Sequence, residues 1–188
     1  MQKLGYKIAP YTDVIIFMVT LLVANYFWKF TVMGDEAGLD STVTWFGLNI
    51  TAPFDLLSKH IAACVYWIVG LFRDTVVMKG DHIVGFQNGH GSSIVWSCSG
   101  LKQMFIWLCL ILTVRGGWKH KLWFIPLGWI ICHAFNILRI AIITLFLEFH
   151  PEWFTILHDY IFKYLFYGMM FLLWVWFVER IRGPLVTE

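Results

Sequence analysis

Charge is scarce in this sequence. Asp, Glu, Lys and Arg make up 14% of its 188 residues, and the formal net charge at pH 7 is only +2. Chains that bind nucleic acid usually carry a basic surface with interleaved aromatic side chains, and no such stripe occurs here. The low charge therefore argues against a nucleic-acid partner.

Paired cysteines are also missing. The four cysteines, Cys64, Cys98, Cys109 and Cys132, form no C-x-x-C pair. Zinc knuckles and thioredoxin-type sites are built on such pairs, so both classes of site are excluded. His82 and His90 share one loop, but no carboxylates or cysteines accompany them at the spacing of metal ligands. We therefore expect neither a metal nor another cofactor.

Long apolar runs, in contrast, are abundant. Hydrophobic residues make up 59% of the chain, and its mean hydropathy is +0.69. The eleven Trp and seven Tyr suit the aromatic belts at membrane–water interfaces. A soluble core does not need runs of this length, so the sequence predicts an all-α integral membrane protein with one domain over residues 1–188. The five predicted hydrophobic helices are 14–32, 54–77, 98–114, 122–147 and 158–178.

The first two runs leave the topology open. The first follows Lys3 and Lys7 and lacks a small-residue cleavage site, so we expect a retained helix and not a removed signal peptide. In the second, only residues 61–72 are free of charge, which favours an interfacial or re-entrant helix as much as a full span. The positive-inside rule places the basic segment 115–121 in the cytoplasm. The third helix, which precedes this segment, must then begin outside. If the N-terminus is also in the cytoplasm, the first helix ends outside, so the second helix must leave and return on the outer face, as a re-entrant helix does. The alternative is that the N-terminus lies outside and the second helix crosses the membrane.

Cys98 differs from the other cysteines because its neighbours are polar. Ser97, Ser99 and Gly100 surround it, at the point where a loop turns into the third apolar run. The glycine-rich loop before it predicts a small extracytoplasmic hairpin that turns at Asn88-Gly89. The other three cysteines lie inside apolar runs, where a thiol usually behaves as a small hydrophobe. Cys98 is therefore the candidate nucleophile.

Two polar residues of later helices are predicted to lie at the depth of Cys98. Arg139 is 17 residues beyond Leu122, which at 1.5 Å per residue is about 26 Å from the cytoplasmic side. That is near the outer edge of a hydrocarbon core about 30 Å thick. His158 opens the fifth helix, which must begin outside. Its neighbour Asp159 either orients the imidazole or is an exposed carboxylate at the start of a helix, and we favour the latter.

These residue types suit covalent catalysis. An arginine within a membrane helix costs about 2.5–3.5 kcal/mol on insertion scales, so Arg139 is expected to face the bundle interior. Asn136 and His133 lie on the same stripe of that helix, either as supporting residues or as interhelical hydrogen-bond partners. A thiol attacks as thiolate, which a nearby cation and a helix N-terminus both favour. Cys98 would then be the nucleophile, His158 the acid and base, and Arg139 the stabiliser of negative charge.

Taken in order, these motifs resemble the exosortase/archaeosortase family of membrane cysteine transpeptidases. The matching pieces are Cys98-Ser99-Gly100 at a helix start, Asn136-Ile137-Leu138-Arg139 within a later helix, and His158 at the opening of the last one. The resemblance covers about residues 50–180, and the chain looks like a short member of the family. It implies that Cys98, Arg139 and His158 are catalytic. The residues expected to bind substrate or support the site are Asn136, Ser99, Gly100, His133 and Asp159.

The resemblance also implies a substrate and a place. Its members act on exported proteins that end in a sorting signal, made of a short motif, a transmembrane helix and a basic tail. Cleavage gives a thioacyl-enzyme, and transfer passes the protein to a surface acceptor. We expect the chain in the bacterial inner membrane, among membrane lipid, with its active site on the extracytoplasmic side. The alternatives are a hydrolytic intramembrane cysteine protease and a non-enzymatic subunit of an export or assembly complex. The oligomeric state stays open.

Overall fold

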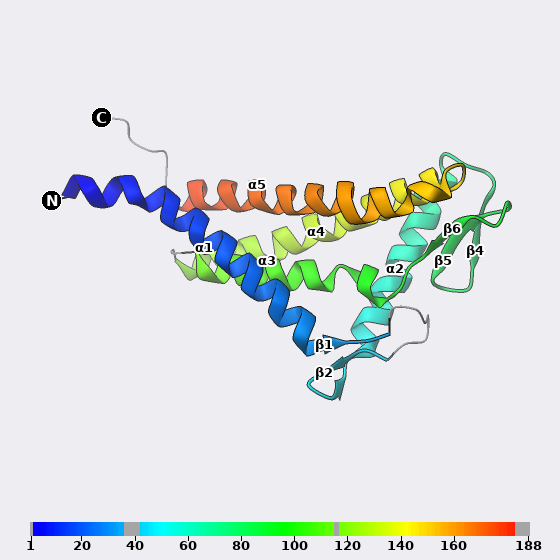
Figure 1. The fold of residues 1–188 in the computed structure, drawn as a ribbon, viewed down its shortest axis with the longest axis horizontal. Helices are drawn as coiled ribbons and strands as arrows, with labels where there is room; N and C mark the ends of the chain where they lie inside the picture. The colour runs from blue at the N-terminus through cyan, green and yellow to red at the C-terminus, as the bar shows by residue number, and fades with distance from the viewer. Residues whose placement is uncertain (1, 36–41, 115–116, 183–188) are drawn as a thin grey trace.

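The fold is a helical bundle. The computed structural model describes residues 2–35, 42–114 and 117–182. Its helices are α1 (Gln2–Thr31), α2 (Thr51–Gly70), α3 (Leu101–Thr113), α4 (Trp118–Leu147) and α5 (Phe162–Arg182). Helices α3, α4 and α5 lie along the long axis of the molecule, and α1 crosses them obliquely (Figure 1). In the described residues, the helical segments long and apolar enough to cross a membrane are Thr12–Thr31, Trp118–Leu147 and Pro151–Arg180, while α3 is apolar but shorter. The predicted all-α membrane bundle is confirmed.

Aromatic side chains fill the core between α1, α3, α4 and α5. Trp107 of α3 is fully buried and lies against Phe124 of α4, with 5.8 Å between the ring centroids. Phe124 in turn stacks on Phe177 of α5 at 4.4 Å. The close approach of α3 to α4 depends on Gly128, because a Cβ at that position would overlap the indole ring of Trp107. The bundle is therefore held by shape-dependent packing of large rings.

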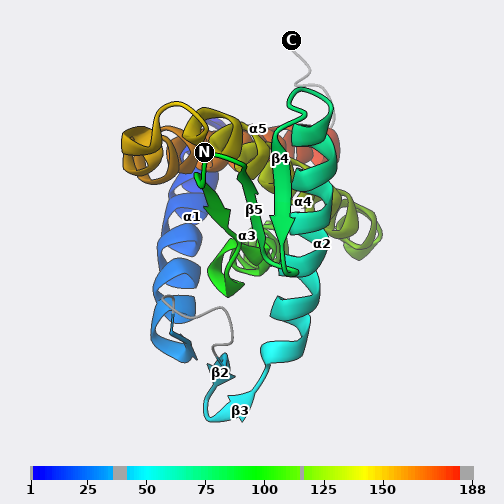
Figure 2. The ribbon, with the colours of Figure 1, turned by 90° about the vertical axis from the view of Figure 1, so that its right-hand side faces the viewer.

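Helix α2 lies across one end of the bundle, as both views show (Figures 1 and 2). Its apolar face is fully buried at Ile61, Val65 and Val69. Its first half carries Asp55 and Lys59, which form an exposed ion pair at 3.1 Å and need contact with water. The helix ends at Gly70 instead of Val77. This arrangement is that of an interfacial or re-entrant helix, the two alternatives to a full span that the sequence left open.

The other end of the bundle collects several helix ends. The start of α1, the end of α3, the start of α4 and the end of α5 all lie away from α2 (Figure 1). Residues 117–121 of the predicted basic segment lie at this end, while Arg115 and Gly116 are outside the described residues. With α2 lying across the bundle, the remaining four helices return the chain to the end at which it began. The chain therefore needs no second full crossing between α1 and α3, which is the topology question that the sequence left open.

Two small antiparallel sheets lie at the α2 end. The predicted hairpin is confirmed by β5 (Ile83–Phe86) and β6 (Gly91–Ser93), which flank the Asn88-Gly89 turn and pair Gly85 with Gly91. The third strand, β4 (Val76–Lys79), adds to the other edge of β5. A second sheet was not predicted: it consists of β1 (Val32–Met33), β2 (Thr44–Trp45) and β3 (Leu48–Asn49). Strand β6 leads directly into the segment that carries Cys98.

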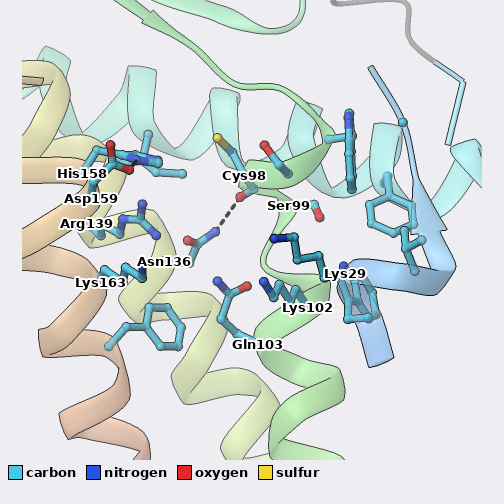
Figure 3. A pocket seen from close by; sticks show the side chains of 18 of the residues that line it. Lys29, Cys98, Ser99, Lys102, Gln103, Asn136, Arg139, His158, Asp159 and Lys163 are labelled. Atoms are coloured by element: carbon cyan, nitrogen blue, oxygen red, sulfur yellow. Dashed lines mark hydrogen bonds and ion pairs between the residues drawn. The ribbon is translucent and has the colours of Figure 1, made fainter. Parts of the chain in front are cut away.

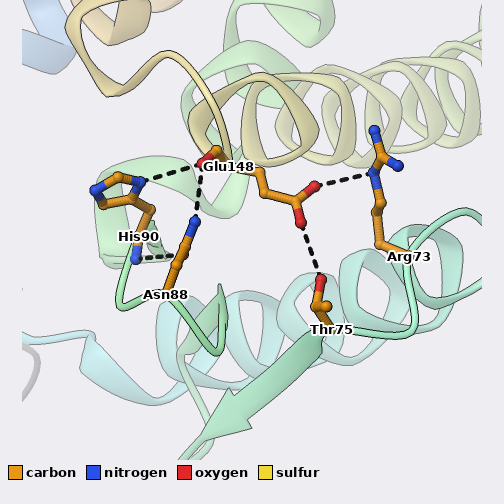
Figure 4. A network of polar contacts seen from close by, with 5 residues as sticks. All are labelled: Arg73, Thr75, Asn88, His90 and Glu148. Atoms are coloured by element: carbon orange, nitrogen blue, oxygen red, sulfur yellow. Dashed lines mark hydrogen bonds and ion pairs between the residues drawn. The ribbon is translucent and has the colours of Figure 1, made fainter.

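A polar network around Glu148 fastens the β4–β6 sheet to the end of α4 (Figure 4). Glu148 is buried, and its carboxylate lies 2.9 Å from Nε of Arg73 and accepts a hydrogen bond from Thr75. Its main-chain oxygen accepts a hydrogen bond of 2.9 Å from Asn88 and lies 3.2 Å from Nδ1 of His90. The sheet before Cys98 is thus tied to the end of α4 at the β5–β6 turn and by the residues that precede β4.

Candidate active site

Cys98 lies in a single turn before α3. The 3₁₀ helix η1 (Trp96–Ser99) contains it, and Gly100 follows with φ of +80° before α3 begins at Leu101. The sequence placed Cys98 or Ser99 at the first turn of the third helix, but the left-handed Gly100 separates that turn from α3. A side chain at Gly100 would be strained and would also crowd the amide of Asn136 at 3.2 Å.

Asn136 fixes this turn to α4. Its side chain is buried, and Nδ2 donates a hydrogen bond of 2.7 Å to the main-chain oxygen of Cys98 (Figure 3). From the other side, Ser58 of α2 donates a hydrogen bond of 3.2 Å to the main-chain oxygen of Val95. Ser99 is buried, and its hydroxyl accepts a hydrogen bond from the main chain of Leu101. The cysteine is therefore held by polar contacts from α2, α3 and α4.

A cavity of about 560 Å³ opens beside Cys98. Its walls come from the end of α1, from α2, η1 and the start of α3, and from α4, α5 and the turn before α5. The predicted site residues that line it are Cys98, Ser99, Asn136, Arg139, His158 and Asp159. The three residues expected at one level thus share one cavity, and the sulfur of Cys98 points toward the side where His158 and Arg139 lie (Figure 3).

Arg139 of α4 is the one arginine among the described residues that line the cavity. It lies three residues after Asn136 on α4, and its guanidinium interacts electrostatically with Cys98, Asp159 and Tyr167. Its Nε is buried and, among the described residues, has no hydrogen-bond partner. A guanidinium has five N–H donors, so this arginine keeps donors for a group that enters the cavity.

His158 and Asp159 form a pair at the cavity wall. Both belong to the π-helical segment η3 (Ile156–Ile161), so the regular part of the last helix begins at Phe162 and not at His158. Nδ1 of His158 lies 2.8 Å from Oδ1 of Asp159, and the imidazole stacks on Phe154 at 5.1 Å. With Nδ1 engaged by the carboxylate, Nε2 is the nitrogen that can take up a proton. Asp159 is an exposed carboxylate in a first helical turn, as the sequence favoured, and it also lies close enough to His158 for the orienting role that was the alternative.

His133 lies elsewhere. Its ring stacks on His60 of α2, with centroids 5.3 Å apart and planes inclined by 15°. His133 is not among the residues that line the cavity, and its buried Nδ1 has no hydrogen-bond partner in the described part of the chain. Its position supports the contact between α2 and α4, at a distance from the reacting groups.

The sequence reasoning missed several lining residues. The residues of the lining that the sequence did not single out include Lys29, Lys102, Gln103, Lys163 and Tyr167. A signal was present for two of the three lysines, because Lys29 and Lys102 lie within a turn of the cavity end of α1 and α3. Only the packing of the helices shows that all three line the same cavity.

Comparison with known proteins gives one match. The profile of the family described as transmembrane exosortase (Exosortase_EpsH) matches residues 39–185. No curated protein and no solved structure matches the chain. The matched range extends from before β2 to the end of α5, so it includes every lining residue of the cavity except those of the α1 end. Together with the three apolar helices, this match identifies an integral membrane protein.

Proposed function

The chain belongs to the transmembrane exosortase family, and on this premise we propose that it is a membrane-embedded cysteine transpeptidase. It would cleave the C-terminal sorting signal of exported proteins and transfer them to a surface acceptor. The observation that carries the proposal is the common cavity of Cys98, Arg139 and the His158–Asp159 pair. These groups are a nucleophile, an anion-stabilising cation and an oriented base, the set that acyl transfer through a thioester needs.

In the first half-reaction, Nε2 of His158 takes the thiol proton and the sulfur of Cys98 attacks the carbonyl carbon of the scissile peptide bond. The oxygen of that carbonyl becomes negatively charged, and the guanidinium of Arg139 stabilises it. When the C–N bond breaks, His158 returns its proton to the leaving amine. The products are a released C-terminal segment and a thioester between the substrate and Cys98.

In the second half-reaction, an acceptor with an amine or hydroxyl group attacks the thioester. His158 removes the proton of the acceptor, and the thiolate of Cys98 leaves. Water could attack in the same way, which would make the enzyme a hydrolytic intramembrane protease. The cavity wall has polar groups from α1, η1, α3, α4, η3 and α5, and a bound acceptor would exclude water from them.

The proposal includes the orientation of the chain. The cavity lies at one end of the bundle, and residues 117–121 and the end of α5, both rich in basic residues, lie at the other (Figure 1). The positive-inside rule supports a cytoplasmic location for the basic end. The cavity would then open on the extracytoplasmic side of a bacterial inner membrane, where exported substrates arrive.

The test is the mass of the processed substrate. We would express the chain with a candidate substrate that ends in a motif, a transmembrane helix and a basic tail. The expected product has lost this tail and gained the mass of an acceptor, and Cys98→Ala abolishes its formation while Cys109→Ala does not. Cys109 is a suitable control because it lies on α3 outside the cavity.

Two other outcomes are informative. A shortened product with only the mass of water added would assign the chain to the hydrolytic alternative. Processing or export that continues unchanged in the Cys98→Ala variant would contradict catalysis by this residue and favour a non-enzymatic subunit. A thioester trapped on Cys98, released by hydroxylamine, would support covalent catalysis independently of the acceptor.

A further inference from the structure

The reaction cavity is lined by more cations than the proposed chemistry uses. Besides Arg139, the described lining residues include Lys29 of α1, Lys102 of α3 and Lys163 of α5, against a single carboxylate, Asp159. Figure 3 shows these lysine side chains reaching into the hollow below Cys98 from three separate helices. One cation is enough to stabilise the oxyanion, so the three lysines need another explanation.

All three lysines lie at one depth. Lys29 lies two residues before the end of α1, and Lys102 and Lys163 are the second residues of α3 and α5. Lys102 and Lys163 follow Cys98 and His158 by four and five residues, so each lies about one helical turn below the thiol or the imidazole. Basic pockets between transmembrane helices are sites at which anionic lipid headgroups bind.

Snorkelling is the simplest alternative explanation for lysines at helix ends. A snorkelling side chain extends away from the bundle to reach water or headgroups. These three lysines instead line a cavity between helices. They also lie at the end opposite to the basic segment, where the positive-inside rule does not favour lysine. Cations gathered in a membrane-embedded cavity mark a path or site for an anion.

An apolar groove continues from this cavity. It has a volume of about 390 Å³, and Trp28, Val32 and Phe54 line both hollows. Along α3 its wall extends from Leu101 to Leu108, about 10 Å down the helix at 1.5 Å per residue. The groove therefore extends from the level of the lysines toward the hydrocarbon core.

We propose that the two hollows together bind one membrane phospholipid with a net negative headgroup. Its phosphate would lie among Lys29, Lys102 and Lys163, and one acyl chain would lie in the groove between α1 and α3. A cationic cavity joined to an apolar groove fits an amphiphile of this kind, whereas a small anion would leave the groove empty. The bound headgroup would lie beside Cys98. The inference goes beyond the proposed function, since binding needs no catalysis.

The experiment uses the full chain carrying Cys98→Ala, so that no turnover occurs. Native mass spectrometry in detergent would count retained phosphatidylglycerol and phosphatidylcholine with identical acyl chains. We expect phosphatidylglycerol to be retained in preference. The double variant Lys29→Gln/Lys163→Gln should lower its retention by about tenfold or more, because two charge-assisted hydrogen bonds are lost.

The matched control is Lys59→Gln/Lys79→Gln. It removes the same charge from α2 and β4 at the same end of the molecule, outside the cavity. The control should retain the lipid as the parent does. An equal loss in both double variants would overturn the proposal, because binding would then reflect the charge of the surface alone. No loss in either variant would also overturn it, because the lysines of the cavity would then not contribute to binding.

Competition distinguishes the source of the phosphate. Inorganic phosphate and glycerol phosphate should displace phosphatidylglycerol only at concentrations far above that of the lipid, since neither fills the groove. Displacement at equal concentration would overturn the lipid assignment in favour of a small anion. Displacement by an acidic peptide together with no preference for phosphatidylglycerol would assign the lysines to the protein substrate, and would leave the proposed transpeptidase function standing.

Discussion

The two ends of the bundle are built on different principles. At the basic end, Trp107, Phe124 and Phe177 pack ring against ring, and Lys121 donates a hydrogen bond of 2.8 Å to the main-chain oxygen of Leu112. At the other end, α2 and two small sheets surround a cavity lined by cations and a thiol, and Arg139 keeps a buried donor without a partner in the described chain. Stability is concentrated where packing is dense, and chemistry where polar groups are left incomplete.

The largest expected difference between the two ends of the bundle is at Cys98, in the polar end. Replacement by Ala removes the sulfur that forms the thioester in the proposed mechanism, so processing should fall by about a thousandfold or more. The melting temperature should be almost unchanged, because the Asn136 hydrogen bond goes to the main chain of Cys98 and survives. Substrate turnover and thermal unfolding of the same preparations would be measured. A large loss of stability in Cys98→Ala would contradict the comparison, because it would show that side-chain packing at Cys98 also stabilises the α2 end.

Arg139 should show the next largest effect. Arg139→Gln removes the charge that faces the oxyanion, and we expect processing to fall by about a hundredfold to a thousandfold. The control is Arg73→Gln, which removes an arginine from the same end of the molecule but outside the cavity. Equal losses in both variants would mean that the net charge of this end, and not the position of Arg139, determines the rate.

Asp159 is a positioning residue, and its effect should be smaller. Asp159→Asn keeps a hydrogen-bonding oxygen near Nδ1 of His158 but removes the charge that stabilises the imidazolium. Processing should fall by about tenfold to a hundredfold, as for comparable orienting carboxylates. The pH profile of processing should also change, because His158 exchanges a proton in each half-reaction and Asp159 faces its ring. A profile of unchanged shape would indicate a merely structural carboxylate.

At the basic end of the bundle, a substitution should lower stability and leave turnover unchanged. In Gly128→Ala the new methyl group overlaps the indole of Trp107, which should lower the free energy of unfolding by about 1–3 kcal/mol. Turnover per folded molecule should stay the same. Gly168→Ala is the matched control, because nothing lies within 4 Å of its Cβ position. Melting in detergent would compare the two, and equal stability would contradict the tight packing of α3 on α4.

The smallest effect is expected at Glu148. Glu148→Gln weakens the ion pair with Arg73, whose side chain is 46% exposed, so solvent screening limits the loss to about 1 kcal/mol. The exposed Glu152→Gln, which affects only the pair with His150, should change stability even less. Chemical unfolding would measure both. A loss of processing at Glu148 without a loss of stability would show that the sheet transmits its position to Cys98.

Much of the catalytic arrangement could be predicted from sequence. Hydropathy located the apolar helices, and the distribution of charge predicted Cys98, Arg139 and His158 at one depth. In the structure all three line one cavity. Local backbone geometry was harder, because a single left-handed residue, Gly100, moves the start of α3 beyond Cys98. The π-helical turn that brings Asp159 against His158 has no signature in a hydropathy pattern either.

The sequence by itself determined that the chain is a membrane bundle and which polar residues it must accommodate, because apolar length and the cost of a buried charge are local properties. Only the tertiary structure decided that α2 lies across the bundle, that His133 faces His60, and that three lysines from separate helices line one cavity. Those outcomes depend on how helices rotate and cross, which is set by side-chain packing between segments far apart in the chain.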